Sequence, residues 1–92
     1  MELGRIYYLQ GNYSKAELAL KQAEYLLSKS NAIFRLAQTQ DYLGDLKDSQ
    51  KDREQAISYY NRSIENYRRL KLKSDGERVM KKLKKVSSVD RE

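Results

Sequence analysis

The sequence predicts an all-α fold of about five helices that pack as antiparallel pairs. Apolar residues recur at gaps of three or four positions through both halves of the chain, which is the spacing of one helix face. A segment near the N-terminus also returns about thirty residues later, which indicates a repeated helix pair. The 92 residues contain no proline and only four widely spaced glycines, so we expect long helices with short breaks in one small domain.

The repeat joins two stretches that begin with leucine. Residues 3–27 read LGRIYYLQGNYSKAELALKQAEYLL, and residues 36–60 read LAQTQDYLGDLKDSQKDREQAISYY. Their first residues lie 33 positions apart, and so do Gly11 and Gly44. This step predicts a helix–turn–helix unit in which Gly44 is the second copy of Gly11.

The second copy carries seven additional residues, because Ala16 and Ala56 lie 40 positions apart instead of 33. These residues fall within Lys47 to Gln55, a segment without an apolar side chain. Seven residues are close to two helical turns, so a projecting helix that keeps its packing face is one interpretation. The other is a loop ahead of a helix capped at Asp52, with Gln55 three residues further on. The polar composition favours the loop.

Helix boundaries follow from the breaks and the capping residues. We expect helices near residues 1–10, 13–28, 31–43, 52–72 and 74–86. Asn12 or Ser14 is suited to cap the second helix, and Glu17 completes a capping box with Ser14. Ser74 and Glu77 have the same spacing at the start of the fifth helix.

The first copy resembles the tetratricopeptide repeat. Its segment LGRIY has the Leu-Gly-x-x-Tyr pattern of that family, and the small and large residues of the second helix follow in order: Gly11, Tyr13, Ala16, Leu20 and Ala23. The second copy departs from the pattern, with Ala37 for the glycine and Gln40 for the tyrosine. We expect small residues where helices approach closely and tyrosines where a gap must be filled. Since Tyr59 and Tyr60 cannot share a helix face, we expect one of them to be exposed.

The resemblance implies a right-handed α-solenoid over residues 1–86. Its units would span about 1–30 and 31–73, followed by a capping helix at 75–86 and a frayed tail at 87–92. The first helix of such a unit normally begins well before its Leu-Gly pair, and here only two residues precede it. This favours a fragment of a longer array over an unusually short first helix.

The resemblance also implies a protein-interaction or scaffolding module whose first helices line an inner, partner-binding surface. The candidate positions are Arg5, Tyr8, Leu9, Asn31, Phe34, Gln38, Asp41, Tyr42, Arg78, Lys81, Lys82 and Lys85. The last four lie on one stripe of the fifth helix, which either binds an acidic partner segment or solvates a capping helix. Phe34 and Tyr42 form either an aromatic patch or part of the helix packing.

Charge and composition limit the other functions. The net charge is +6, and between Arg68 and Lys85 nine basic residues accompany two acidic ones. Nucleic-acid binding is the alternative function, although no aromatic residue is interleaved with these cations for base stacking.

The chain has no cysteine or histidine and no catalytic motif, so we expect no enzyme, cofactor or metal site. Without a signal sequence or a long apolar run, we expect a cytoplasmic protein that does not bind membranes. Self-association through Ile6 and Leu9 is a further expectation.

Overall fold

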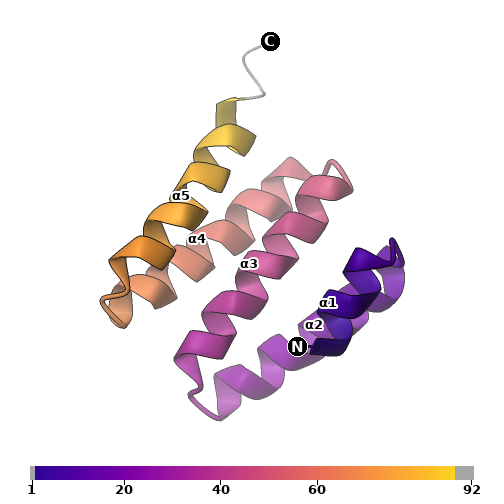
Figure 1. Ribbon diagram of the computed structural model, residues 1–92, viewed down its shortest axis with the longest axis horizontal. Helices are drawn as coiled ribbons and strands as arrows, with labels where there is room; N and C mark the ends of the chain where they lie inside the picture. Colours follow the sequence, from indigo (N-terminus) through magenta and orange to yellow (C-terminus); the bar gives the residue numbers. More distant parts are fainter. Residues whose placement is uncertain (1, 89–92) are drawn as a thin grey trace.

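The structure, a computed structural model, describes residues 2–88 as five helices without a strand. The helices are α1 (Glu2–Leu9), α2 (Tyr13–Lys29), α3 (Ile33–Ser49), α4 (Arg53–Arg69) and α5 (Lys73–Ser88). Each helix packs against the next one in the chain and runs in the opposite direction (Figure 1). The prediction of an all-α fold is confirmed.

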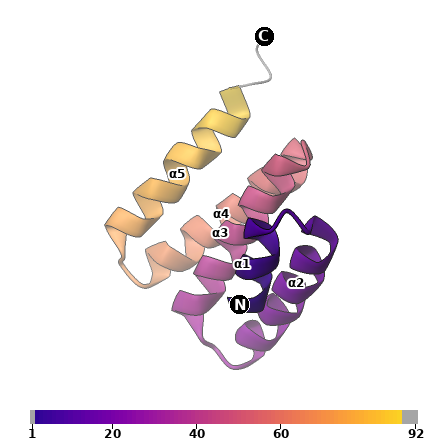
Figure 2. The same cartoon turned by 45° about the vertical axis from the view of Figure 1, so that its right-hand side comes forward.

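The helices form two layers. In Figure 1, α1, α3 and α5 lie in front of α2 and α4, and Figure 2 shows α5 at the opposite end of the stack from α1 and α2. The molecule measures 41 × 33 × 17 Å along its principal axes, so it is a slab two helices thick. We call the exposed side of the α1, α3 and α5 layer the inner face.

The turns reveal the true length of the repeat. Each of the four turns contains one residue with a positive φ, and these residues follow one another at intervals of 20: Gly11, Asn31, Lys51 and Lys71. A helix and its turn therefore occupy 20 residues, and a helix pair occupies 40. The predicted step of 33 residues is wrong.

The tight contacts between helices obey the same 40-residue step. A Cβ atom on Gly4 would lie 2.6 Å from Leu20 Cγ, and a Cβ atom on Gly44 would overlap the Tyr60 ring. Gly4 and Gly44 are 40 residues apart, as are Leu20 and Tyr60. Gly44 is therefore the copy of Gly4, and the prediction that it copies Gly11 is wrong. The close approach of two helices, which a side chain would block, places glycine here.

The polar segment from 47 to 55 is mainly helical. Helix α3 continues to Ser49, beyond its predicted end at 43, and α4 begins at Arg53 after a turn of three residues. The predicted loop is therefore wrong, but the cap is confirmed, because the Asp52 carboxylate accepts a hydrogen bond from the Gln55 N–H at 3.3 Å. Lys47 is buried in this segment and pairs with Glu17 at 3.1 Å, which explains how a polar stretch can pack.

Among the other predicted caps, Asn12 is confirmed, whereas Ser14 with Glu17 and Ser74 with Glu77 are wrong. Asn12 caps α2 by accepting a hydrogen bond from the Lys15 N–H at 3.4 Å, whereas Ser14 lies inside the helix and Glu17 forms ion pairs with lysines. Ser74 likewise lies inside the first turn of α5. Residues 87 and 88 are helical instead of frayed, and the rest of the predicted tail lies outside the described residues.

The core alternates small and large residues as predicted. Ala16, Ala37 and Ala56 are fully buried, and Tyr60 is 1% exposed. Tyr59 is also buried, so the expectation that one of the adjacent tyrosines is exposed is wrong. Tyr59 packs in the cluster that contains Ala16, while Tyr60 packs in the one that contains Ala37. Helix α4 is thus covered on two sides, which allows both rings to be buried.

Candidate protein-interaction surface

Three helices and one turn carry the residues predicted to bind a partner. Arg5, Tyr8 and Leu9 lie on α1; Phe34, Gln38, Asp41 and Tyr42 lie on α3; Arg78, Lys81, Lys82 and Lys85 lie on α5; and Asn31 lies in the turn before α3. These helices form a single layer (Figure 1). The candidates consequently share one layer, but their contacts differ from one helix to the next.

Two carboxylates of α3 face two cations of α5. Arg78 donates a hydrogen bond to Asp41 at 2.9 Å, and Lys82 donates to Asp41 at 3.0 Å and to Asp45 at 3.1 Å. The Tyr60 hydroxyl donates to the other Asp45 oxygen at 2.6 Å. We call Asp41, Asp45, Arg78 and Lys82 the ionic cluster. The Asp41 side chain is only 6% exposed, so the cluster is partly withdrawn from water.

The ionic cluster changes the acidity of its members. Burial raises the pKa of Asp45, although the hydrogen bond from Tyr60 opposes this effect. Burial also works against the ammonium form of Lys82, but the attraction of Asp41 and Asp45 prevails and raises its pKa. The hydrogen bond to Asp41 raises the pKa of Arg78. Arg78 and Lys82 are therefore held as cations that bind α5 to α3.

The other two cations of the stripe have no such role. Lys81 and Lys85 are exposed, and neither pairs with a carboxylate within residues 2–88. They are four residues apart and so lie on the same face of α5. Of the four basic residues predicted to bind a partner, these two remain available to an external anion.

The two aromatic candidates on α3 pack in different places. The Phe34 ring is 44% exposed and meets the Tyr67 ring edge-on, with 6.1 Å between the centroids. Tyr42 is half-buried against the cluster that contains Leu20 and Leu43. Phe34 is therefore part of the helix packing while one side of its ring stays accessible, and the two rings do not form one patch.

The remaining candidates lie on α1, on α3 and in the turn between α2 and α3. The Tyr8 hydroxyl lies 3.2 Å from Ser49 Oγ, which links α1 to the end of α3. Arg5 donates to Glu2 at 3.4 Å and is half-buried, as is Gln38. Asn31 occupies the turn with a φ of 61°.

Asp45 is the residue of this site that the sequence analysis missed. Asp41 and Asp45 are four residues apart on α3, and Arg78 and Lys82 have the same spacing on α5. Each pair occupies one helix face, and the charges of the two pairs are opposite. That matching spacing was the available signal for an ion-paired contact between the two helices.

The described part of the chain has neither a metal-binding cluster nor a helix that could span a membrane. Residues 2–88 contain no group of three or more histidine, cysteine, aspartate or glutamate side chains placed to hold a metal ion. Among the same residues, no helix combines the length and the apolar character that crossing a bilayer requires.

Comparison with protein families agrees with the geometry. A family model described as tetratricopeptide repeat matches residues 1–26 and 43–69, which together are more than half of the chain. The first match contains Gly4 and the second contains Gly44, the two glycines that the 40-residue unit relates. No curated protein and no solved structure matched the chain. Such repeats are in general non-catalytic and mediate protein–protein interaction or scaffolding. The chain therefore belongs to the tetratricopeptide repeat family.

Proposed function

We propose that this module binds an acidic, extended segment of a partner protein on its inner face, without catalysis. The proposal rests on one observation: Lys81 and Lys85 are exposed and have no counterion among residues 2–88, while Arg78 and Lys82 beside them are paired with α3. A carboxylate of the partner supplies the counterion that these two lysines lack.

The other predicted residues provide the uncharged part of the proposed contact. Phe34 offers the accessible side of its ring, and the half-buried Gln38 lies one turn further along α3. Arg5, Tyr8, Asn31 and Tyr42 extend the contact towards α1. We place the interaction in the cytoplasm.

The first experiment is a pull-down from cell lysate with the tagged chain, at moderate salt and with or without nuclease. The wild type is compared with Lys81→Glu/Lys85→Glu. The matched control is Lys29→Glu/Lys51→Glu, which changes the net charge equally at exposed positions outside the inner face. We expect one discrete protein that survives nuclease, is lost in the α5 variant and is kept in the control.

Two results would overturn the proposal. Equal recovery of the protein by the wild type and the α5 variant would move the contact away from Lys81 and Lys85. Recovery of nucleic acid alone, with a steep dependence on salt, would assign the basic surface to phosphate binding instead.

A further inference from the structure

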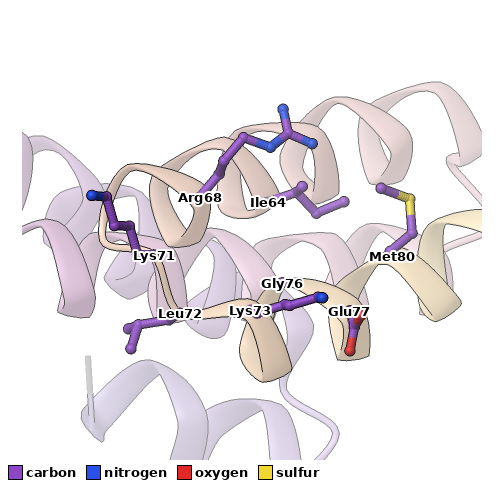
Figure 3. A pocket seen from close by; sticks show the side chains of 8 residues that line it. All are labelled: Ile64, Arg68, Lys71, Leu72, Lys73, Gly76, Glu77 and Met80. Carbon is purple, nitrogen blue, oxygen red and sulfur yellow. The ribbon is translucent and has the colours of Figure 1, made fainter.

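Helices α4 and α5 form the walls of an open groove (Figure 3). It has a volume of about 510 Å³ and is lined by Ile64, Arg68, Lys71, Leu72, Lys73, Gly76, Glu77 and Met80. We call it the α4/α5 groove. Ile64, Leu72 and Met80 supply apolar surface, and Gly76 leaves room beside them (Figure 3). Arg68, Lys71 and Lys73 place three cations around the turn that joins the two helices.

The equivalent groove one unit earlier, between α2 and α3, holds a helix, beside which a pocket of about 340 Å³ stays open. Helix α4 lies in it, with Ser63 Oγ donating to the Ala37 carbonyl at 2.8 Å and Asn66 Nδ2 donating to Gln40 Oε1 at 2.7 Å. The α4/α5 groove consists of the residues 40 positions further on, in the same fold. Its shape is consequently that of a seat for one more helix.

The α2/α3 groove, which we call the filled seat, and the α4/α5 groove, which we call the open seat, differ in chemistry. The differences fall at the positions where α4 makes polar contacts in the filled seat. In the filled seat, Arg62 pairs with Glu24 at 3.4 Å and Asn66 bonds Gln40. In the open seat, Ile64 replaces Glu24 and Met80 replaces Gln40. A helix that fits the open seat therefore carries apolar side chains at the two positions, four residues apart, where α4 has arginine and asparagine.

The charges of the seat determine which end of that helix is acidic. Tyr67, near the end of α4, packs on Phe34 at the start of α3, so a helix in the open seat would end beside the turn at 70–72. Lys71 and Lys73 lie there without an ion pair among the described residues. Their equivalents one unit earlier, Asn31 and Ile33, are uncharged. Cations at this place attract the negative end of a helix dipole and acidic side chains in its last turn.

We infer that the α4/α5 groove binds an amphipathic helix of a partner protein, with two apolar residues four positions apart and an acidic last turn. A second copy of the chain fits less well. Its α2 would present Leu26 to Met80, but that helix ends with Lys29, which the cations of the groove repel. The site is separate from the inner face and does not depend on the proposed function.

The probe that tests this inference is a synthetic peptide with the α4 sequence, Arg53–Arg69. It carries Arg62→Leu, Asn66→Leu, Arg68→Glu and Arg69→Glu, and a control peptide keeps the last two arginines. Binding to the full chain is measured by fluorescence anisotropy. We expect the acidic peptide to bind at least about tenfold more tightly than the control peptide, since opposite charges meet at the turn.

Two variants of the chain locate the binding. Met80→Gln gives the groove the polar residue that Gln40 supplies one unit earlier, at the place where the peptide carries a leucine. Met80 is half-buried, so thermal melting checks that this variant stays folded. Lys71→Glu/Lys73→Glu reverses the charge at the turn, and Lys29→Glu/Lys51→Glu is the matched control. We expect Met80→Gln and the charge reversal each to weaken binding of the acidic peptide about tenfold.

Four outcomes would overturn the inference. The first is equal binding of the two peptides, and the second is unchanged affinity in Met80→Gln. The third is an equal loss in the charge-reversal variant and its control, which would indicate non-specific attraction to the basic chain. The fourth is self-association that Met80→Gln abolishes, which would assign the groove to a second copy. Failure of the inner-face experiment leaves these results unaffected, because Lys81 and Lys85 do not line the groove.

Discussion

Tyr60 joins α4 to α3 with both its ring and its hydroxyl group. The ring packs against Gly44, and the hydroxyl donates to Asp45 at 2.6 Å. Burial raises the pKa of Tyr60 above its ordinary value, and the hydrogen bond to Asp45 adds to the effect. The folded protein therefore holds the phenol proton more tightly than the unfolded chain does.

This difference predicts how stability depends on pH at the alkaline end. A raised folded-state pKa gives stabilisation that is complete below the ordinary tyrosine pKa of about 10 and is lost as the pH rises above it. We expect the free energy of unfolding, from urea titrations at pH 8 and 11, to fall less in Tyr60→Phe than in the wild type. At pH 8 the variant should be less stable by about 1 kcal/mol, because the hydrogen bond is lost. An equal fall in both proteins would contradict this prediction.

Gly44 and Gly76 are expected to respond in opposite ways to the same substitution. A Cβ atom at Gly44 overlaps the buried Tyr60 ring, so Gly44→Ala should destabilise the fold by about 1–3 kcal/mol. At Gly76 the added atom has room, and Gly76→Ala should stabilise the fold by up to about 1 kcal/mol through helix propensity. Urea unfolding of both variants measures the two effects. A loss of stability in both variants would contradict this prediction, because Gly76 lacks the close contact that is expected to make Gly44→Ala destabilising.

At the scale of the elements, the ionic cluster determines how α5 is held. Helix α5 packs along α4 through Val79 and Val86, which are buried, and the cluster ties its polar side to α3. Asp41 is shared by two cations, so removing one of them leaves it partly paired. The loss of both carboxylate contacts of Lys82 should therefore loosen α5 without unfolding the other helices.

This contact can be tested by hydrogen exchange. In Lys82→Gln we expect the amides of α5 to exchange faster, with their opening free energy lowered by about 1–3 kcal/mol, because the buried Asp41 and the half-buried Asp45 lose a charged partner. The amides of α2 should change little. Lys81→Gln is the control, since Lys81 is exposed and unpaired among the described residues. Equal exchange in the two variants would mean that the apolar contacts alone hold α5.

At the scale of the whole molecule, the N-terminal end of the slab exposes a group of large apolar side chains. Six large apolar side chains on α1 and α2 are at least 44% exposed: Leu3, Ile6, Leu9, Leu18, Tyr25 and Leu26. Helix α1 has only 8 residues beside the 17 of α2, so it covers only part of its partner. The end of the slab is therefore a surface suited to self-association.

We predict that sedimentation equilibrium will show an association that depends on protein concentration. Ile6→Ser/Leu9→Ser should weaken it at least about tenfold, because each copy buries less apolar surface. Leu70→Ser is the control, since Leu70 is 38% exposed but lies near the other end of the stack. A wild-type chain that stays monomeric at high concentration would refute this prediction.

The sequence alone determined the helical class, the pairing of helices and the resemblance to the family that the comparison confirmed. These features depend on local spacing, such as apolar residues three or four apart and the residues of LGRIY, and each segment carries that information by itself. Asp52 was recognised as a cap for the same reason, because a cap binds its own first turn.

Only the tertiary structure decided which distant residues correspond and which charges are free. Gly44 corresponds to Gly4 because each lies where the next helix packs closely against it, and at Gly44 the contact is the Tyr60 ring of α4. Spacing along the sequence had aligned Ala37 with Gly4 instead. Arg78 and Lys82 resembled Lys81 and Lys85 as members of one basic stripe, but folding brings carboxylates about 40 residues away against the first pair only. Close approach and charge neutralisation depend on neighbours that the fold supplies, and no local pattern specifies them.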